Sequence, residues 1–112
     1  MPTAETIDLG FSTADAEHPV ISYMNGDLTL TFLDWREQPI RVVVRDVTRF
    51  EWSGESAAHL KGEPLDGTCV ARDSVWVPRK AGNRCEHYCL NFNACGGRLD
   101  VACESFGLEP RT

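Results

Sequence analysis

The dipeptide Asn25-Gly26 constrains the fold of this chain more than any other feature of the sequence. It separates two runs in which apolar and polar residues alternate. A two-residue type I′ turn needs positive φ at both central positions, and Asn followed by Gly adopts this conformation most readily. The pattern therefore predicts an antiparallel hairpin with one apolar face. Its facing pairs are then Tyr23 with Leu28 and Ile21 with Leu30.

Further stretches also show strand patterning. Residues 40–45 are a β-branched run whose apolar face completes a three-stranded meander, with a bend expected near Asp46. A second hairpin is predicted around the turn at Gly96-Gly97, with Tyr88, Leu90 and Phe92 on the same face as Leu99, Val101 and Cys103. Shorter strands are expected at residues 7–11, 68–71 and 74–78. Ser53 can cap one short helix over residues 53–62.

These elements predict one globular domain over residues 1–112. The expected fold class is mainly β: an antiparallel meander, a sandwich or an open barrel of about six to eight strands with one short helix. The 42% apolar and 25% charged content is typical of a globular protein, and no apolar run reaches the length of a membrane helix.

The negative charge lies in the first third of the chain. Six of the 17 acidic residues and none of the basic ones precede Arg36, so the net charge of −6 arises there. This distribution disfavours binding to nucleic acid or to an anionic membrane surface, because both repel acidic groups. It favours a basic protein partner, although an acidic surface also serves solubility alone.

Five cysteines occur in the second half: Cys69, Cys85, Cys89, Cys95 and Cys103. An odd number of cysteines, in a sequence without a recognisable export signal, favours free thiols over a disulfide framework. The expected location is therefore the cytoplasm or another reducing compartment.

Metal binding is one alternative for these cysteines and His87. Structural zinc sites usually take two thiolates from a tight turn such as Cys-x-x-Cys, and no such pair occurs here. On an extended strand Cys85 and Cys89 would lie about 13 Å apart, and Cys103 should face away from Cys89. We therefore expect no metal and no cofactor, and predict that the cysteines are reduced and packed in or near the core.

Nucleophilic catalysis is a second alternative. Cys69 or Cys89 could pair with His59 or His87, but the sequence has no Gly-x-Ser-x-Gly turn and no local arrangement that places a base beside a nucleophile. We therefore predict no catalytic residue. A small metal-binding or thiol-dependent enzyme centred on His87 and the neighbouring cysteines remains the alternative function.

The predicted function is recognition of another protein. Trp35 lies in a polar connection between strands, where a large aromatic side chain either fills the core or anchors an interface. The core role is the stronger expectation for the residue itself. As an anchor, Trp35 would form a binding surface with Asp27 and Asp34 for a basic partner. A homodimer joined through strand edges is a further alternative.

Residues 26–35 and 40–52 together resemble the strand-rich core of small β-rich bacterial proteins, some of which are grouped with immunity proteins of polymorphic toxin systems. The resemblance implies a non-enzymatic inhibitor that covers a basic site on a toxin. Opposite fields would accelerate capture, and buried aromatic side chains would slow release.

Overall fold

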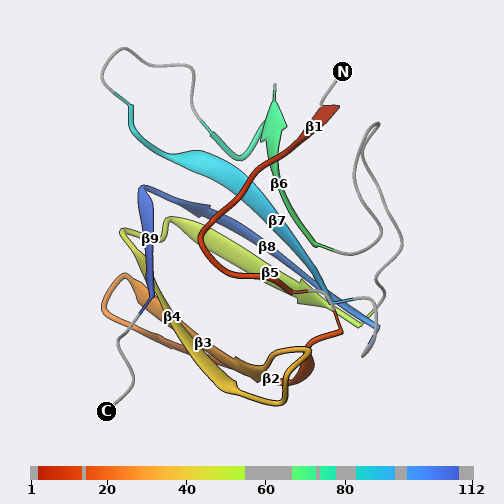
Figure 1. Ribbon diagram of the computed structural model, residues 1–112. Helices are drawn as coiled ribbons and strands as arrows, with labels where there is room; N and C mark the ends of the chain where they lie inside the picture. Colours follow the sequence, from red (N-terminus) through yellow and green to blue (C-terminus); the bar gives the residue numbers. More distant parts are fainter. Residues whose placement is uncertain are drawn as a thin grey trace.

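The structure is a computed structural model that describes residues 3–13, 15–54, 67–72, 74–77, 83–92 and 96–108. These residues form nine antiparallel strands, one more than the highest number predicted, and no helix (Figure 1). In chain order the strands are β1 (Thr3–Thr6), β2 (Glu17–Met24), β3 (Asp27–Leu33), β4 (Pro39–Arg45), β5 (Arg49–Ser53), β6 (Gly67–Arg72), β7 (Glu86–Phe92), β8 (Gly97–Cys103) and β9 (Ser105–Leu108).

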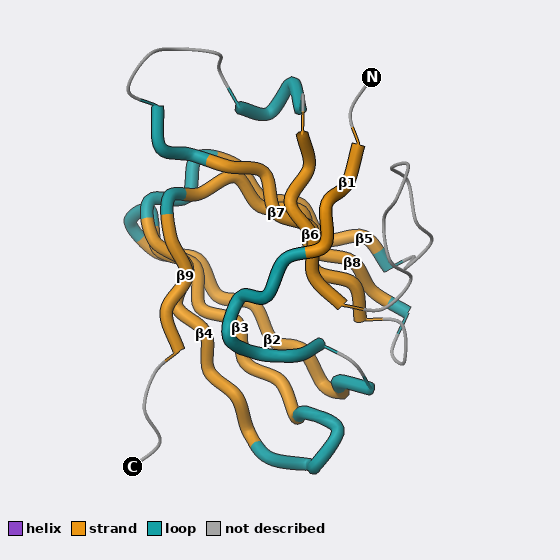
Figure 2. The backbone as a smooth tube through the Cα atoms, turned by 45° about the horizontal axis from the view of Figure 1, so that its top comes forward, coloured by secondary structure: helices purple, strands orange, loops and turns teal. Residues whose placement is uncertain are grey.

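The strands make two sheets that pack against each other, so the sandwich among the predicted architectures is the one observed. The first sheet has the order β1-β6-β7-β8-β5 and the second has the order β2-β3-β4-β9. Figures 1 and 2 show the first sheet above the second, with the chain crossing between them after β1, β4 and β8. No helix long and apolar enough to cross a membrane occurs in the described part of the chain.

The hairpin at Asn25-Gly26 is confirmed with its register. Tyr23 pairs with Leu28 and Ile21 pairs with Leu30 across β2 and β3. Asn25 and Gly26 have φ values of 53° and 87°, as a type I′ turn requires. The third strand is also confirmed, because β4 pairs with β3 so that its apolar residues face those of the hairpin.

The core lies between the sheets and is made by the inward-facing residues of both. Phe92 of β7 joins the two layers: its ring lies 5.6 Å from that of Phe32 in the second sheet and 5.7 Å from that of Trp52 in β5. The predicted facing of the second hairpin is confirmed, since its apolar side belongs to this core. The core side chains from β7 and β8 are Tyr88, Leu90, Phe92, Leu99, Val101 and Cys103.

The bend predicted near Asp46 is confirmed and has a larger consequence than a bulge. Asp46 has a φ of 55°, and the chain leaves the second sheet here. Val47 fills the core at this crossing, and β5 then pairs with β8 in the other sheet. The strand that follows β4 in the chain, β5, is therefore an edge strand of the first sheet.

The strand predicted at residues 7–11 is wrong, because β1 ends at Thr6. The Asp8 carboxylate accepts a hydrogen bond from the Gly10 N–H, and Gly10 has a φ of 89°, which no regular strand adopts. This segment crosses between the sheets (Figure 2), and Leu9 and Phe11 pack against the core. The apolar residues of this segment alternate with others because they pack between the sheets, and not because the segment pairs within a sheet.

Two other predictions on secondary structure are not borne out. Residues 74–77 form a turn where a strand over 74–78 was predicted; the Ser74 hydroxyl accepts a hydrogen bond from the Trp76 N–H, and Val75 is 94% exposed. The short helix predicted at residues 53–62 is absent where the structure can show it, because Ser53 ends β5. Residues 55–62 of that prediction lie outside the described residues.

Candidate functional site

The outer face of the first sheet carries a cluster of reactive side chains. Because side chains alternate between the faces of a strand, His87 and Cys89 point away from the core that Tyr88 and Leu90 fill. In the observed register Cys89 lies opposite Asp100 of β8 and opposite Cys69 of β6. Three neighbouring strands thus place a histidine, two thiols and a carboxylate on one face.

Three of these groups lie within hydrogen-bonding distance of one another. His87 Nε2 is 2.8 Å from Asp100 Oδ1, and Cys89 Sγ is 3.2 Å from the same oxygen and 3.8 Å from Nε2. Arg98 Nη2 donates to Asp100 Oδ1 at 3.0 Å and to Cys89 Sγ at 3.2 Å. Only Asp100 keeps appreciable exposure, with 16% of its side chain accessible. The cluster is therefore a largely desolvated charge network.

The turn at residues 74–77 covers the histidine. Ser74 Oγ lies 2.6 Å from His87 Nδ1, and the Trp76 indole stacks on the imidazole with an interplanar angle of 4° and a centroid distance of 4.4 Å. The Arg49 guanidinium lies over the Trp76 indole, 4.1 Å from the ring centroid. Both nitrogens and the plane of the imidazole are consequently held in place.

These contacts shift the ionisation of the cluster. Burial alone would lower the pKa of His87, but its hydrogen bonds with Asp100 and Cys89 raise the pKa to about 9. Burial would raise the pKa of Asp100, whereas the His87 hydrogen bond and the Arg98 charge hold the pKa below its usual value. A hydrogen bond with Cys69, followed by burial, raises the pKa of the Cys89 thiol. These pKa shifts favour an imidazolium on His87, a carboxylate on Asp100 and a neutral thiol on Cys89.

This arrangement does not suit nucleophilic catalysis by Cys89. In a catalytic triad the nucleophile and the carboxylate contact opposite nitrogens of the histidine, whereas Cys89 and Asp100 here share Nε2. Ser74 occupies the opposite nitrogen, Nδ1. The hydrogen bond with Asp100 raises the pKa of His87 and so favours the protonated imidazole, which can accept a proton from neither Ser74 nor Cys89.

The three residues predicted to bind a partner do not lie together. Asp27 begins β3 and forms an ion pair with Arg45, with Oδ2 3.0 Å from Nη1. Asp34 follows the other end of β3 and is only 5% exposed; its carboxylate accepts hydrogen bonds from the backbone N–H groups of Arg36 and Gln38. Burial would raise the pKa of Asp34, but the Gln38 and Arg36 hydrogen bonds lower it.

The core role expected for Trp35 is wrong. Trp35 is 61% exposed in the turn after β3, and the Arg36 guanidinium lies 5.4 Å from its ring centroid. Hydrogen bonds to the Asp34 carboxylate close this turn, and the indole lies outside the core. The exposed indole is compatible with the anchor role, which stays a prediction.

A groove of exposed aromatic side chains lies where the two sheets open at one edge. It has a volume of about 390 Å³ and is lined by Pro19, Ile21, Phe50 and Trp52. The ring of Tyr23 lies 5.1 Å from that of Phe50, which joins β2 of one sheet to β5 of the other. The register shows why these side chains are found here: Ile21 and Tyr23 pair with core residues of β3, and Phe50 and Trp52 pair with core residues of β8.

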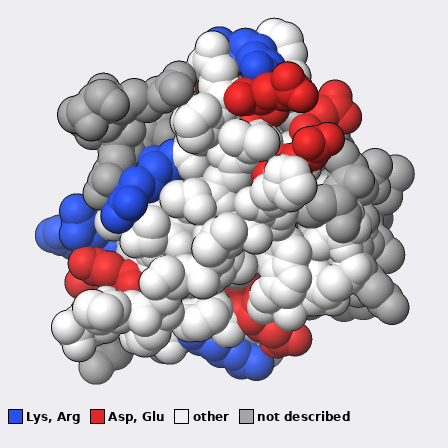
Figure 3. Space-filling model, turned by 90° about the horizontal axis from the view of Figure 1, so that it is seen from below, with Lys and Arg blue, Asp and Glu red and all other residues white. Residues whose placement is uncertain are grey.

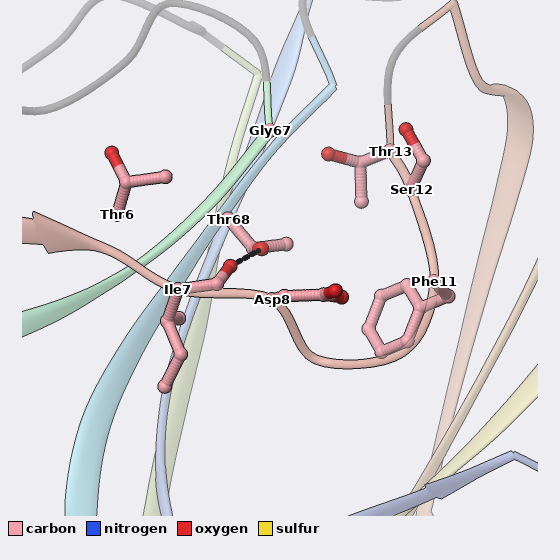
Figure 4. A pocket seen from close by; sticks show the side chains of 8 residues that line it. All are labelled: Thr6, Ile7, Asp8, Phe11, Ser12, Thr13, Gly67 and Thr68. Carbon is pink, nitrogen blue, oxygen red and sulfur yellow. Dashed lines mark hydrogen bonds between the residues drawn. The ribbon is translucent and has the colours of Figure 1, made fainter.

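A second cavity, of about 240 Å³, lies beside β1 and the start of β6 (Figure 4). Its polar side chains serve the backbone. The Thr68 hydroxyl donates to the Ile7 carbonyl at 2.7 Å, and the Thr13 hydroxyl donates to the Asn91 carbonyl at 2.8 Å. Asp8 already accepts from the Gly10 N–H. These groups hold the crossing segment in place, and we assign no ligand to this cavity.

The sequence pointed to His87 but not to Asp100. The predicted scattering of the thiols is borne out in part, because Cys103 belongs to the core whereas Cys89 lies on the outer face, and Cys95 lies outside the described residues. Asp100 and Cys69, the cross-strand neighbours of Cys89, were not predicted from the sequence to lie beside it. If the loop of the second hairpin has four residues, the register pairs Cys89 with Asp100, as observed. The loop length was therefore the sequence signal that could have identified Asp100 as a neighbour of Cys89.

The buried thiol of Cys103 should make stability fall at high pH. Burial, followed by the nearby Cys85, raises the pKa of Cys103 to about 12, against 9.0 when unfolded. Above pH 9 the unfolded chain releases this proton and the folded chain keeps it, so the free energy of unfolding falls by about 1.4 kcal/mol per pH unit. Urea denaturation between pH 8 and 10.5 should show a steeper decline for the wild type than for Cys103→Ala. Equal slopes would contradict the prediction.

No protein-family model, no curated protein and no solved structure shows significant similarity to this chain.

Proposed function

We propose that the protein is a non-enzymatic binding protein that recognises an extended segment of a basic partner protein. The observation that carries the proposal is the aromatic groove between β2 and β5, defined by Pro19, Ile21, Phe50 and Trp52. Tryptophan and tyrosine side chains are among the residues that most often dominate the binding energy of protein interfaces, where they fill well-packed pockets.

The groove lies between two strands to which a partner strand can be added. Among the described strands, β2 is outermost in its sheet and β5 is outermost in the other. An outermost strand presents a row of backbone N–H and C=O groups, which a bound peptide can pair with in the manner of an added strand. Alternate side chains of that peptide would then enter the groove.

The surface around the groove is rich in exposed apolar groups. Of the exposed large apolar side chains, Tyr23, Phe50 and Trp52 lie on the inward faces of these two strands at the groove, whereas Val20 and Met24 lie on the opposite face of β2. Trp52 packs on the backbone of Gly97, because a Cβ at that position would collide with the indole. Seen from below, on the side of the second sheet, neutral side chains fill the middle of the described face and charged ones lie toward its margins (Figure 3). Such a surface favours a macromolecular partner.

The charge distribution favours a basic partner. The net charge is −6; Asp27 and Asp34 are ion-paired with Arg45 and Arg36, but Asp15 and Glu17, just before and at the start of β2, are exposed. Long-range attraction to a basic surface would raise the association rate, and the aromatic groups would slow dissociation. An immunity-type inhibitor of a basic toxin is the narrower form of this proposal.

The test is capture of a partner by the tagged protein, followed by a binding measurement with that partner in purified form. Phe50→Ser should weaken binding by at least about tenfold, as expected for an interface anchor, while Val75→Ser should not change it. Val75 is the matched control, since it is apolar, 94% exposed and distant in sequence from the groove. The association rate should fall as salt is raised.

Equal affinities of the wild type and Phe50→Ser for the partner would exclude the groove as the binding site. A salt-independent association rate would contradict the role of the acidic surface. If light scattering finds a stable dimer that Phe50→Ser disrupts, the occupant of the groove is a second copy of this chain, and recognition of a different protein is wrong.

A further inference from the structure

The geometry points to a zinc site that is independent of the proposed binding function: His87 Nε2, Cys89 Sγ and Asp100 Oδ1 hold one zinc ion on the outer face of the first sheet. These three atoms lie within 4.8 Å of one another. The aromatic groove lies at the edge between the sheets, so either proposal can fail without the other.

The separations of the three atoms are each within about 0.5 Å of those of a tetrahedral zinc site. At typical zinc distances of about 2.0–2.3 Å, two ligands at a tetrahedral angle lie about 3.3–3.6 Å apart. The observed separations are 2.8 Å from nitrogen to oxygen, 3.2 Å from sulfur to oxygen and 3.8 Å from sulfur to nitrogen. Adjustments of about 0.5 Å or less would therefore form the ligand triangle.

The ligands project from paired strands. His87 and Cys89 are two residues apart in β7, so both side chains leave the same face, and Asp100 of β8 lies directly opposite Cys89. His87 and Cys89 are buried, and Asp100 is the member of the set that keeps some contact with solvent. The sheet thus holds the donor atoms together in the absence of an ion. An ion would reach the site from solvent on the side of Asp100, the partly exposed ligand.

The surrounding groups are those that support a zinc site. A histidine that binds metal through one nitrogen usually donates its other N–H to an oxygen, and Ser74 Oγ lies 2.6 Å from His87 Nδ1. Arg98 Nη2 donates to both Cys89 Sγ and Asp100 Oδ1, where it would stabilise the thiolate and orient the carboxylate. Trp76 stacks on the imidazole and fixes its plane.

The donor chemistry favours zinc over other common ions. Sulfur and imidazole nitrogen are poor ligands for Mg²⁺ or Ca²⁺, which prefer oxygen, and are typical ligands for Zn²⁺. Binding would replace the hydrogen bonds within the cluster, and the protons held by Cys89 and His87 would be released to solvent. The charges of a zinc ion, one thiolate and one carboxylate add up to zero. With the Arg98 guanidinium included, the net charge of the occupied site would be +1.

The test is titration of the full-length, reduced and chelator-treated protein with Co²⁺ and with Zn²⁺. Co²⁺ should give thiolate-to-cobalt charge-transfer absorption with an end point of one ion per chain, and Zn²⁺ should abolish this absorption by displacement. Zn²⁺ should also raise the melting temperature, and a chelator should reverse the rise. If the wild type shows neither a charge-transfer band nor a shift in melting temperature, the site does not exist.

Matched variants identify the ligands. Cys89→Ser and His87→Gln should lose the band, while Cys103→Ala, which removes a buried thiol on the opposite face, should keep it. Ser74→Ala leaves all three ligands in place and should weaken zinc binding by about 10–100-fold. Circular dichroism establishes that each variant is folded. A band of wild-type intensity in folded Cys89→Ser would overturn the assignment, as would wild-type affinity in Ser74→Ala.

Discussion

Replacing Phe92 with alanine should lower the free energy of unfolding by about 3–5 kcal/mol. Phe92 is fully buried, and its ring contacts aromatic rings in both sheets, Phe32 at 5.6 Å and Trp52 at 5.7 Å. Truncation would remove this link between the layers and leave a cavity that paired strands cannot easily collapse. The measurement is urea denaturation at pH 7 under reducing conditions.

Phe50→Ala provides the control for this prediction. Phe50 is also an inward-facing aromatic residue, but it is 38% exposed at the edge of the sandwich. Its truncation should cost about 1 kcal/mol, because much of the lost contact area was already in water. Comparable losses for the two variants would mean that the layers are not joined at Phe92.

Asp100→Ala is expected to lower the free energy of unfolding by about 3 kcal/mol in the presence of a chelator. The carboxylate interacts with His87 and with Arg98, whose side chain is only 4% exposed. Removing one member of a buried charged group leaves the others desolvated without their counter-ion, which typically costs 3–5 kcal/mol. We expect the lower end of this range because Asp100 itself is 16% exposed.

Glu51→Ala is the matched control for Asp100. Glu51 lies directly opposite Asp100 on β5 and is exposed. Removal of this carboxylate should change the free energy of unfolding by about 0.5 kcal/mol or less. Equal effects of the two substitutions in urea denaturation would show that the His87 cluster does not contribute a specific charge network. Because this experiment is done with a chelator, it is independent of zinc binding.

The His87 cluster and the aromatic groove both arise because successive side chains of a strand point to opposite faces of the sheet. On β7 the inward residues build the core and the outward residues bring His87 and Cys89 together. On β2 and β5 the inward residues reach the edge of the sandwich, where the core itself becomes accessible as the groove. The aromatic groove could not be predicted from the sequence, since Ile21 and Trp52 have the pattern of ordinary core residues.

The sequence by itself determined the local pairings of this protein: the type I′ turn at Asn25-Gly26, the register that follows from it and the apolar faces of the second hairpin. These depend on neighbouring residues and on an alternation of period two, which is present in the chain before it folds. Only the tertiary structure decided that β5 joins the sheet opposite β4, that residues 7–11 cross between layers and that β6 lies beside β7. Such choices depend on contacts between distant residues, and the meeting of His87, Cys89 and Asp100 under the Ser74 turn is their product.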